Sequence, residues 1–435
     1  EYTAVRAALP ADVVSTERRQ EAIQALAARG LPSSRDENWR YANLRPLERA
    51  RFVPVAAAAV TAASAEPAAG HLPARLQGFA RYTFVDGAFA PELSSPEEQA
   101  GLTVRTLRRA IRGGATVTQL PHALPALSSL PEARLALLNE AFATDTADVH
   151  VGGATNSPQC VELVFVAVAG ADAGASYPRV QVTLDAGTRL VLVERHLSAG
   201  GGANFVNSAV QVAAGRDAEL THYRLQSAGP RATWLDTLTA VLGASARYRL
   251  LTVNTGALSA RSTTYVQMAG AGAELTLSAA ALGDRQQVQD NFALVEHIAP
   301  RARTEQIFRG IASGRARVAF NGKIVVREGA AGTDSRQSFR GLLAGPEAEI
   351  DVRPQLEIYT DEVKCSHGAT AGKLDDDMLF YLLSRGLSPE VAQRLLKWAF
   401  LEDVVSKIGI PELRRQIEHD LAGQMADAAS LKELL

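Results

Sequence analysis

The stretch Val182–Val193, VTLDAGTRLVLV, contains two short apolar runs separated by a turn of small residues. Similar stretches follow: VQVAAGRDAELT from Val210, LTAVLGASARYR from Leu238, VQMAGAGAELTL from Val266 and VEHIAPRARTEQ from Val295. Successive starts are 28, 28, 28 and 29 residues apart. A fixed period of this size, made of strands alone, predicts a β-solenoid in which each coil buries its apolar face against the next.

Chance offers a simpler explanation, because turns rich in alanine and glycine resemble one another in any protein. The agreement of the spacings favours the solenoid. We therefore predict a mainly β fold, with a right-handed parallel β-helix (β-solenoid) over residues 148–372. A mostly helical N-terminal domain (1–147) precedes it and a helical C-terminal domain (373–435) follows it.

The N-terminal region mixes helical patterns with turns. A helix is expected after a cap at Ser15 or Thr16, with Gly30 ending it. Residues 53–80 are rich in alanine and proline and are expected to form a loop. Asp86-Gly87 predicts a tight hairpin turn, and Leu130–Ala143 predicts another helix.

The C-terminal region has three helix-start signals. Asp375 can cap a first helix that Gly386 ends, Ser388-Pro389 begins a second helix, and Pro411 begins a third. The expected result is a small helical unit beside the last coil.

Composition limits the function. The chain has 435 residues, 47% of them hydrophobic and 21% charged, and a net charge of −2. No basic surface for nucleic acid and no membrane-spanning run is expected. Two cysteines exclude a disulfide framework and suit a reducing compartment. We expect a cytoplasmic protein of more than one domain.

Familiar catalytic motifs are missing from the sequence. It contains no zinc spacing of cysteines, no phosphate-binding glycine–lysine loop and no GxSxG elbow. Cys160 lies in a β-like run and is expected to pack in a core. His222 and His297 lie within the repeats, where a core or surface role is more common than metal binding.

Cys365 and His367 are the strongest candidates for a site. If the β pattern continues, they lie two residues apart on one strand face, with Cα atoms about 6.5–7 Å apart. That separation is awkward for a nucleophile–base pair but allows both side chains to reach one soft metal. Two ligands leave a metal incompletely coordinated, so further ligands would have to come from another chain. A structural role for both residues remains the alternative.

Longer segments around this pair resemble a known family. Gln355–Val405, QLEIYTDEVKCSHGATAGKLDDDMLFYLLSRGLSPEVAQRLLKWAFLEDVV, closely resembles the C-terminal signature of the SufD branch of the SufB/SufD scaffold proteins of iron–sulfur cluster assembly. SSRDENWRYANLRPL (Ser33–Leu47) and FVDGAFAPELS (Phe84–Ser94) resemble its N-terminal half. The SufB branch tends to carry Cys-Glu-His-Glu-Ala where this chain has Cys365–Ala369.

The resemblance implies a non-catalytic scaffold subunit in a complex with a SufB-type paralogue and a SufC-type ABC ATPase. A transient iron–sulfur cluster would be built at the interface with SufB, and none would be held stably by the isolated chain. His367, and less securely Cys365, are implied as interfacial ligands. The C-terminal helices would bind the ATPase, with these candidate contacts: Leu379, Phe380, Leu396, Trp398 and Phe400. For Trp398 and Phe400, a role in the core is favoured over a role as exposed docking residues.

Two other functions stay open. One is a carbohydrate-active enzyme built on a β-helix, which the aromatic content of 6% and the cysteine usage disfavour. The other is a homodimeric assembly protein, because the last strand of a solenoid is an open edge that can pair with a second copy.

Overall fold

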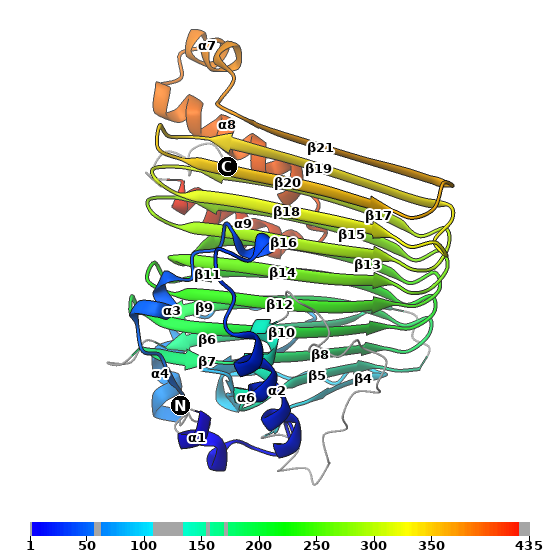
Figure 1. Cartoon of the computed structure of the whole chain (residues 1–435). Coiled ribbons are helices and arrows are strands. Elements are labelled where there is room, and N and C mark those ends of the chain that lie inside the picture. The colour runs from blue at the N-terminus through cyan, green and yellow to red at the C-terminus, as the bar shows by residue number, and fades with distance from the viewer. Residues whose placement is uncertain (1, 56–61, 108–133, 154–156, 169–172, 426–435) are drawn as a thin grey trace.

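A computed structural model describes residues 2–55, 62–107, 134–153, 157–168 and 173–425. Two sheets, of 11 and 10 strands, face each other and wind into a β-solenoid of about 7 turns (Figure 1). From β8 onward, successive strands alternate between the two sheets, and neighbours within a sheet run parallel. The predicted mainly β fold with a solenoid core is confirmed.

The first sheet, here called sheet A, contains β1 (Val53–Pro54), β4 (Leu102–Arg105), β5 (Ala147–Val151), β7 (Gly174–Ser176), β8 (Arg179–Leu184), β10 (Asn204–Ala214), β12 (Thr233–Leu242), β14 (Ser259–Met268), β16 (Val288–His297), β18 (Arg317–Val326) and β20 (Glu349–Ile358). Sheet B contains β2 (Ala80–Val85), β3 (Ala88–Phe89), β6 (Gln159–Val168), β9 (Arg189–Ala199), β11 (Glu219–Ala228), β13 (Arg247–Gly256), β15 (Glu274–Gly283), β17 (Arg303–Ala312), β19 (Thr333–Leu343) and β21 (Val363–Gly372).

The helices flank the solenoid. They are α1 (Tyr2–Val5), α2 (Thr16–Arg29), α3 (Arg45–Arg49), α4 (Ala62–Ala69), α6 (Arg134–Phe142), α7 (Asp376–Ser384), α8 (Pro389–Val405) and α9 (Pro411–Gln424), with 3-10 turns η1 (Arg6–Ala8), η2 (Glu37–Trp39) and η4 (Pro91–Leu93). Ser15, Asp375 and Ser388 cap α2, α7 and α8 through their side chains, as the sequence predicts. Residues 62–69 were expected to be loop but form α4, because runs of alanine favour helix.

Small residues at the turns of the repeat let the coils stack. At one corner an alanine lies fully buried in each successive coil, as Ala218, Ala246, Ala273 and Ala302. The preceding residue in each coil has a positive φ, between 55° and 70°. Gly270 is required by close approach, since a Cβ there would lie 1.9 Å from the backbone nitrogen of Ala244. The alanine–glycine turns are therefore a consequence of coil stacking.

The spatial repeat is less regular than the sequence spacing suggests. Val210 pairs with Leu238, as a 28-residue coil requires, but Val182 pairs with Val212. Val266 likewise pairs with Ala240 rather than Leu238. Each slip is two residues, which keeps the same side chains facing inward because the side-chain period of a strand is two. The corners absorb these differences in coil length.

Strands from the first 147 residues also join the sheets. β2 pairs in parallel with β6, and the hairpin strand β3 closes the edge of sheet B. The predicted Asp86-Gly87 turn has positive φ at both positions, 48° and 85°. The first coil therefore uses residues from the expected N-terminal domain, while the domain boundaries themselves stay a prediction.

Candidate functional site

The two ends of the solenoid differ in how they are covered. At the first coil, β4 pairs antiparallel with β5, and every residue of β2 and β3 is buried. At the last coil, β20 and β21 are the terminal strands of the two sheets, and no further strand of the described ranges pairs with them (Figure 1). Residues from Ser366 to Gly372 are all exposed. The end that contains β21 is an open edge, and we call it the open end.

Cys365 and His367 lie on β21 at this open end, as the sequence predicts for their strand position. Cys365 pairs with Ser335 and His367 with Gln337, both buried residues of β19. Cys365 is half-buried and packs against the apolar cluster between the sheets. By strand alternation His367 points toward the same inter-sheet side, but it is exposed because no coil covers it.

Burial raises the pKa of the Cys365 thiol, and the nearby Asp334 carboxylate raises it further. The thiol is therefore mostly protonated at neutral pH, and a metal would have to displace its proton. Within the described residues, no three His, Cys, Asp or Glu side chains are grouped closely enough to hold a metal ion. A metal at Cys365 and His367 would need ligands from elsewhere.

The other sequence candidates are core residues. Cys160 packs against the apolar cluster on the outer face of sheet B, and burial raises the pKa of its thiol. His297 is fully buried and forms a hydrogen bond with the Thr304 hydroxyl at 3.0 Å. Burial lowers the pKa of its imidazole to about 4. His222 is fully buried between Tyr248 and Glu194, at 3.1 and 3.2 Å. Core packing was expected for Cys160, and a core or surface role for the two histidines, which the structure places in the core.

The middle coils contain a buried charged cluster that was not predicted from the sequence. Arg224 contacts Glu194 at 2.7 Å and Asp236 at 2.6 Å, and His196 contacts Glu194 at 2.6 Å. Burial raises the pKa of Glu194, but Arg224 and the two histidines outweigh it and hold this pKa well below its usual value. Burial lowers the pKa of Arg224, but Asp236 and Glu194 outweigh it and hold this pKa well above its usual value.

The sequence signal for this buried cluster is a charged residue within an otherwise apolar strand pattern, as in VLVERH and THYRLQ. Pairing these charges required the register, in which Arg224 lies beside Glu194 in the next strand.

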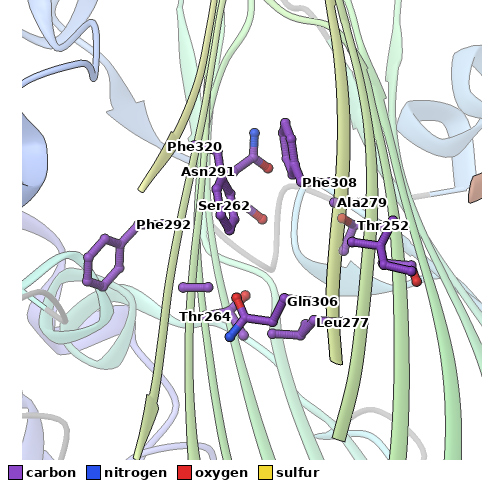
Figure 2. Close-up of a pocket in the computed structure, with 13 residues that line it drawn as sticks. Thr252, Ser262, Thr264, Leu277, Ala279, Asn291, Phe292, Gln306, Phe308 and Phe320 are labelled. Carbon is purple, nitrogen blue, oxygen red and sulfur yellow. The ribbon is translucent and has the colours of Figure 1, made fainter. Parts of the chain in front are cut away.

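A small cavity lies between the sheets and is lined by both polar and apolar side chains (Figure 2). Thr264, Asn291 and Gln306 line it together with Phe308 and Phe320, and its volume is about 40 Å³. This is room for about three water molecules. It is too small for a sugar ring, so it offers no substrate site of the kind that a β-helix carbohydrate enzyme needs.

The C-terminal helices separate into a packed part and an unpacked part. α8 and α9 cover the outer face of sheet B, where Trp398 and Phe400 pack against the apolar cluster as half-buried residues. Leu396 is also half-buried, in α8. α7 lies away from the sheets and contains no buried residue (Figure 1). Its Phe380 is 73% exposed, while Leu379 is half-buried.

Comparison with known proteins identifies the family. A sequence model described as the SufBD core domain of SUF system FeS cluster assembly matches residues 165–400. The chain belongs to the SufBD family. The matched range covers most of the repeating coils, the open end and α7 with most of α8, so the candidate pair on β21 lies inside the SufBD domain.

Individual relatives agree with the family assignment. The chain is 29% identical to the iron–sulfur cluster assembly protein SufD of Escherichia coli, over 92% of this chain and 90% of the relative. It is 29% identical to a SufBD family iron–sulfur cluster assembly protein of Synechocystis, over 93% and 90% of the two chains. It is 30% identical to the chloroplastic protein ABCI7 of Arabidopsis thaliana, over 57% and 53%. The chain is thus a SufD-like protein of iron–sulfur cluster assembly.

Across the described ranges, no helix combines the length and the apolar character needed to cross a bilayer.

Proposed function

We propose that this SufBD protein is a non-catalytic scaffold subunit of a SufBCD-type complex, and that an iron–sulfur cluster is assembled where its open end meets a SufB-type paralogue. The observation that carries the proposal is an incomplete ligand pair, the Cys365 thiol and the His367 imidazole, on an edge strand that is paired on one side only. The cluster is cargo, and the isolated chain holds none stably.

The chemistry of the pair suits transfer better than storage. Iron–sulfur clusters are commonly held by four cysteine thiolates, and replacing thiolate by imidazole changes the electronic properties of the cluster. One exposed imidazole and one half-buried, protonated thiol bind weakly on their own. A partner that adds thiolates would complete the set only while the two chains are together.

The edge strand supplies a way to bring such a partner close. An exposed strand edge is a template for pairing with another chain. In an antiparallel pair, opposite residues have Cα atoms about 4.5–5.5 Å apart. A partner strand along β21 would therefore place one of its side chains beside His367.

A second docking surface is expected on α7, for an ABC-type ATPase subunit. Met378, Phe380 and Tyr381 are 58%, 73% and 55% exposed on one short helix. Exposed apolar groups grouped in this way indicate a protein contact. Trp398 and Phe400 are less suited to this role, because both pack against the solenoid. The ATPase activity would belong to the partner, and the location would be the cytoplasm.

The two alternative functions are a homodimeric assembly protein and a carbohydrate-active enzyme. A homodimer through the open end uses the same edge and is expected when the chain is alone. A glycoside hydrolase needs a pair of carboxylates flanking a sugar site. A groove lies among the N-terminal helices, and among the described residues Glu48 is the only carboxylate that lines it.

Complementation of a strain that depends on this pathway tests the proposed cluster site. His367→Ala should abolish cluster delivery while the complex still assembles, as judged by gel filtration. Cys365→Ala should have a weaker effect. His419→Ala, at an exposed histidine of α9, is the matched control. Full activity of His367→Ala would remove the cluster role and leave this stretch a structural strand end.

Binding of the ATPase subunit is tested separately. Phe380→Asp should prevent co-purification of the ATPase, because it places a charge in the expected apolar contact. Gln393→Asp, on an exposed position of α8, adds the same charge elsewhere and should leave binding intact. Equal binding by both variants would move the docking surface away from α7.

A further inference from the structure

The groove among the N-terminal helices takes no part in the proposed cluster site or in the contact expected on α7. It is lined by residues of α1, α2, α3, α6 and β10, and its volume is about 910 Å³. α2 and α6 lie beside the first coils, far from β21 (Figure 1). A concave surface of this size, built where several elements meet, is typical of a binding site.

Aromatic side chains line much of the groove. Neighbouring ring centroids are 5.1–6.2 Å apart in a continuous row of five rings: Tyr2, Phe142, Tyr177, Phe205 and Phe52. Leu31, just after α2, also lines the groove and is 53% exposed. Apolar groups gathered in this way at the surface indicate a contact with another molecule.

The walls of the groove are fixed in place by polar contacts. The buried Arg19 guanidinium of α2 donates to the carbonyls of Ala141 and Ala143, at the end of α6, at 3.0 and 2.8 Å. Arg18 of α2 forms an ion pair with Glu140 of α6 at 2.9 Å. β1 pairs with β7, which holds the segment after α3. The groove is therefore formed before any ligand enters, which lowers the entropy cost of binding.

Basic side chains border the apolar surface. Arg6, Arg49 and Arg51 line the groove and are exposed, and Glu48 is the one carboxylate among its described lining residues. The groove is thus locally positive in a chain whose net charge is −2. The arginines come from two places, η1 and the end of α3, so a ligand should carry negative charges at more than one point.

An amphipathic helix with acidic side chains meets both requirements. Its apolar face can cover the aromatic row, as in the helix-in-groove mode of recognition. A helix is about 10–12 Å wide and rises about 1.5 Å per residue, so each residue fills roughly 120–170 Å³ and the groove holds about two turns. A lone carboxylate or phosphate would leave the aromatic row uncovered.

The chain's own segments outside the described ranges are poorer occupants by charge. Residues 108–133 contain three arginines and one glutamate, and residues 56–61 contain no charged residue. Neither segment complements a basic groove.

We propose that the groove binds an acidic amphipathic helix of a partner protein, with its apolar face on the aromatic row and its carboxylates near Arg6, Arg49 and Arg51. The inference does not rest on the proposed cluster site, because the groove shares no residue with β21 or α7. A helix bound here leaves both of those regions accessible.

Fluorescence anisotropy with the full-length chain tests the inference. The probe is a labelled helical peptide of about 12 residues, with leucines along one face and glutamates along the other. A second peptide carries lysines in place of the glutamates. The glutamate peptide should bind at least about 10-fold more tightly, because like charges are unfavourable in an interface. Its advantage should shrink as the salt concentration rises.

Matched variants locate the binding. Ala27→Trp adds an indole at an exposed lining position of α2 and should weaken binding by about 10-fold or more, since the ring takes space that the ligand needs. Ala28→Trp, at an exposed neighbour that does not line the groove, should bind as the unmodified chain does. Arg49→Glu should weaken binding, whereas the exposed control Arg35→Glu should not. Thermal melts verify folding of each variant.

Several outcomes overturn the inference. Equal binding of the two peptides removes the role given to charge, and equal effects of the two tryptophan variants place the binding elsewhere. Binding of neither peptide overturns it as well. If the aromatic anion anilinonaphthalene sulfonate then binds and Ala27→Trp blocks it, the groove is a small-molecule site instead. If the glutamate peptide binds only a variant that lacks residues 426–435, the chain's own C-terminal segment is the occupant. None of these outcomes bears on the proposed role of His367.

Discussion

The first and last coils of the solenoid are built from the same kind of strand. In the described part of the chain, only the first coil is closed by antiparallel strands. At the first coil, antiparallel strands β3 and β4 close both sheets, and the residues of β2 are buried. At the last coil, β21 is exposed along most of its length. A solenoid needs capped ends for solubility. Among the described residues no cap covers the last coil, and the proposed partner would supply one.

The middle coils and the open end also differ in how their polar groups are satisfied. In the middle coils, Arg224, Glu194 and Asp236 are buried and paired with one another. At the open end, His367 is exposed on a strand without a neighbour. Substitutions in the middle coils should therefore lower the free energy of unfolding. Substitutions at the open end should impair function and leave stability unchanged. Four predictions test this contrast.

The largest effect is expected in the buried charged cluster. Arg224→Ala leaves Glu194 and Asp236 without their cation in a dry interior, and should cost about 3–5 kcal/mol of unfolding free energy. Chemical denaturation measures the loss. Arg247→Ala removes an exposed pair with Glu219 and should cost less than about 1 kcal/mol. Similar losses from the two variants would mean that the cluster contributes no more than a surface pair.

The next effect is a pH dependence from His297. Its folded pKa of about 4 lies below the value of roughly 6.5 for an unfolded histidine. The unfolded chain therefore binds this proton first as pH falls. The stability contribution is full above pH 6.5 and falls by about 1.4 kcal/mol per pH unit between pH 6.5 and 4. Denaturation of the protein and of His297→Gln across this range should give a shallower slope for the variant. Equal slopes would contradict the neutral buried state.

A smaller effect is expected where the chain leaves the open end. The Asp375 carboxylate accepts hydrogen bonds from Asp377 and Met378 at 3.0 Å and caps α7. Asp375→Ala should cost about 0.5–2 kcal/mol of local helix stability. Because α7 is not packed on the sheets, hydrogen exchange should rise in α7 while β21 and α8 keep their protection. Faster exchange throughout the solenoid would show that α7 is coupled to it.

The smallest effect is expected at the candidate ligands themselves. His367→Ala removes an exposed side chain and should change the unfolding free energy by less than about 0.5 kcal/mol. Thermal melts measure this on the same protein used for complementation. A large loss of stability would mean that His367 supports the fold, and would weaken the contrast between the two ends.

Much of this organisation could be predicted from the sequence. The recurring turns of small residues predicted the solenoid because only small side chains fit where coils approach, as at Gly270. Asp86-Gly87, Ser388 and Pro389 predicted their turn and helix start through local backbone preferences. The strand position of Cys365 and His367 followed from alternation, whereas their role as ligands stays a prediction.

The sequence failed where contacts between distant coils decide the outcome. The apparent period of 28 residues concealed slips of two residues, because the corners accept extra residues without changing which side chains face inward. The pairing of Glu194 with Arg224 and Asp236 depends on register and on the approach of the two sheets.

By itself, the sequence determined the class of fold, the local turns and caps, and the position of a cysteine and a histidine near the end of the last strand. These are set by short-range periodicity and backbone preference, which a linear chain displays directly. Only the tertiary structure decided which end of the solenoid stays open and which buried charges meet. Those outcomes depend on strand register and on neighbours separated by a full coil, and no local pattern encodes them.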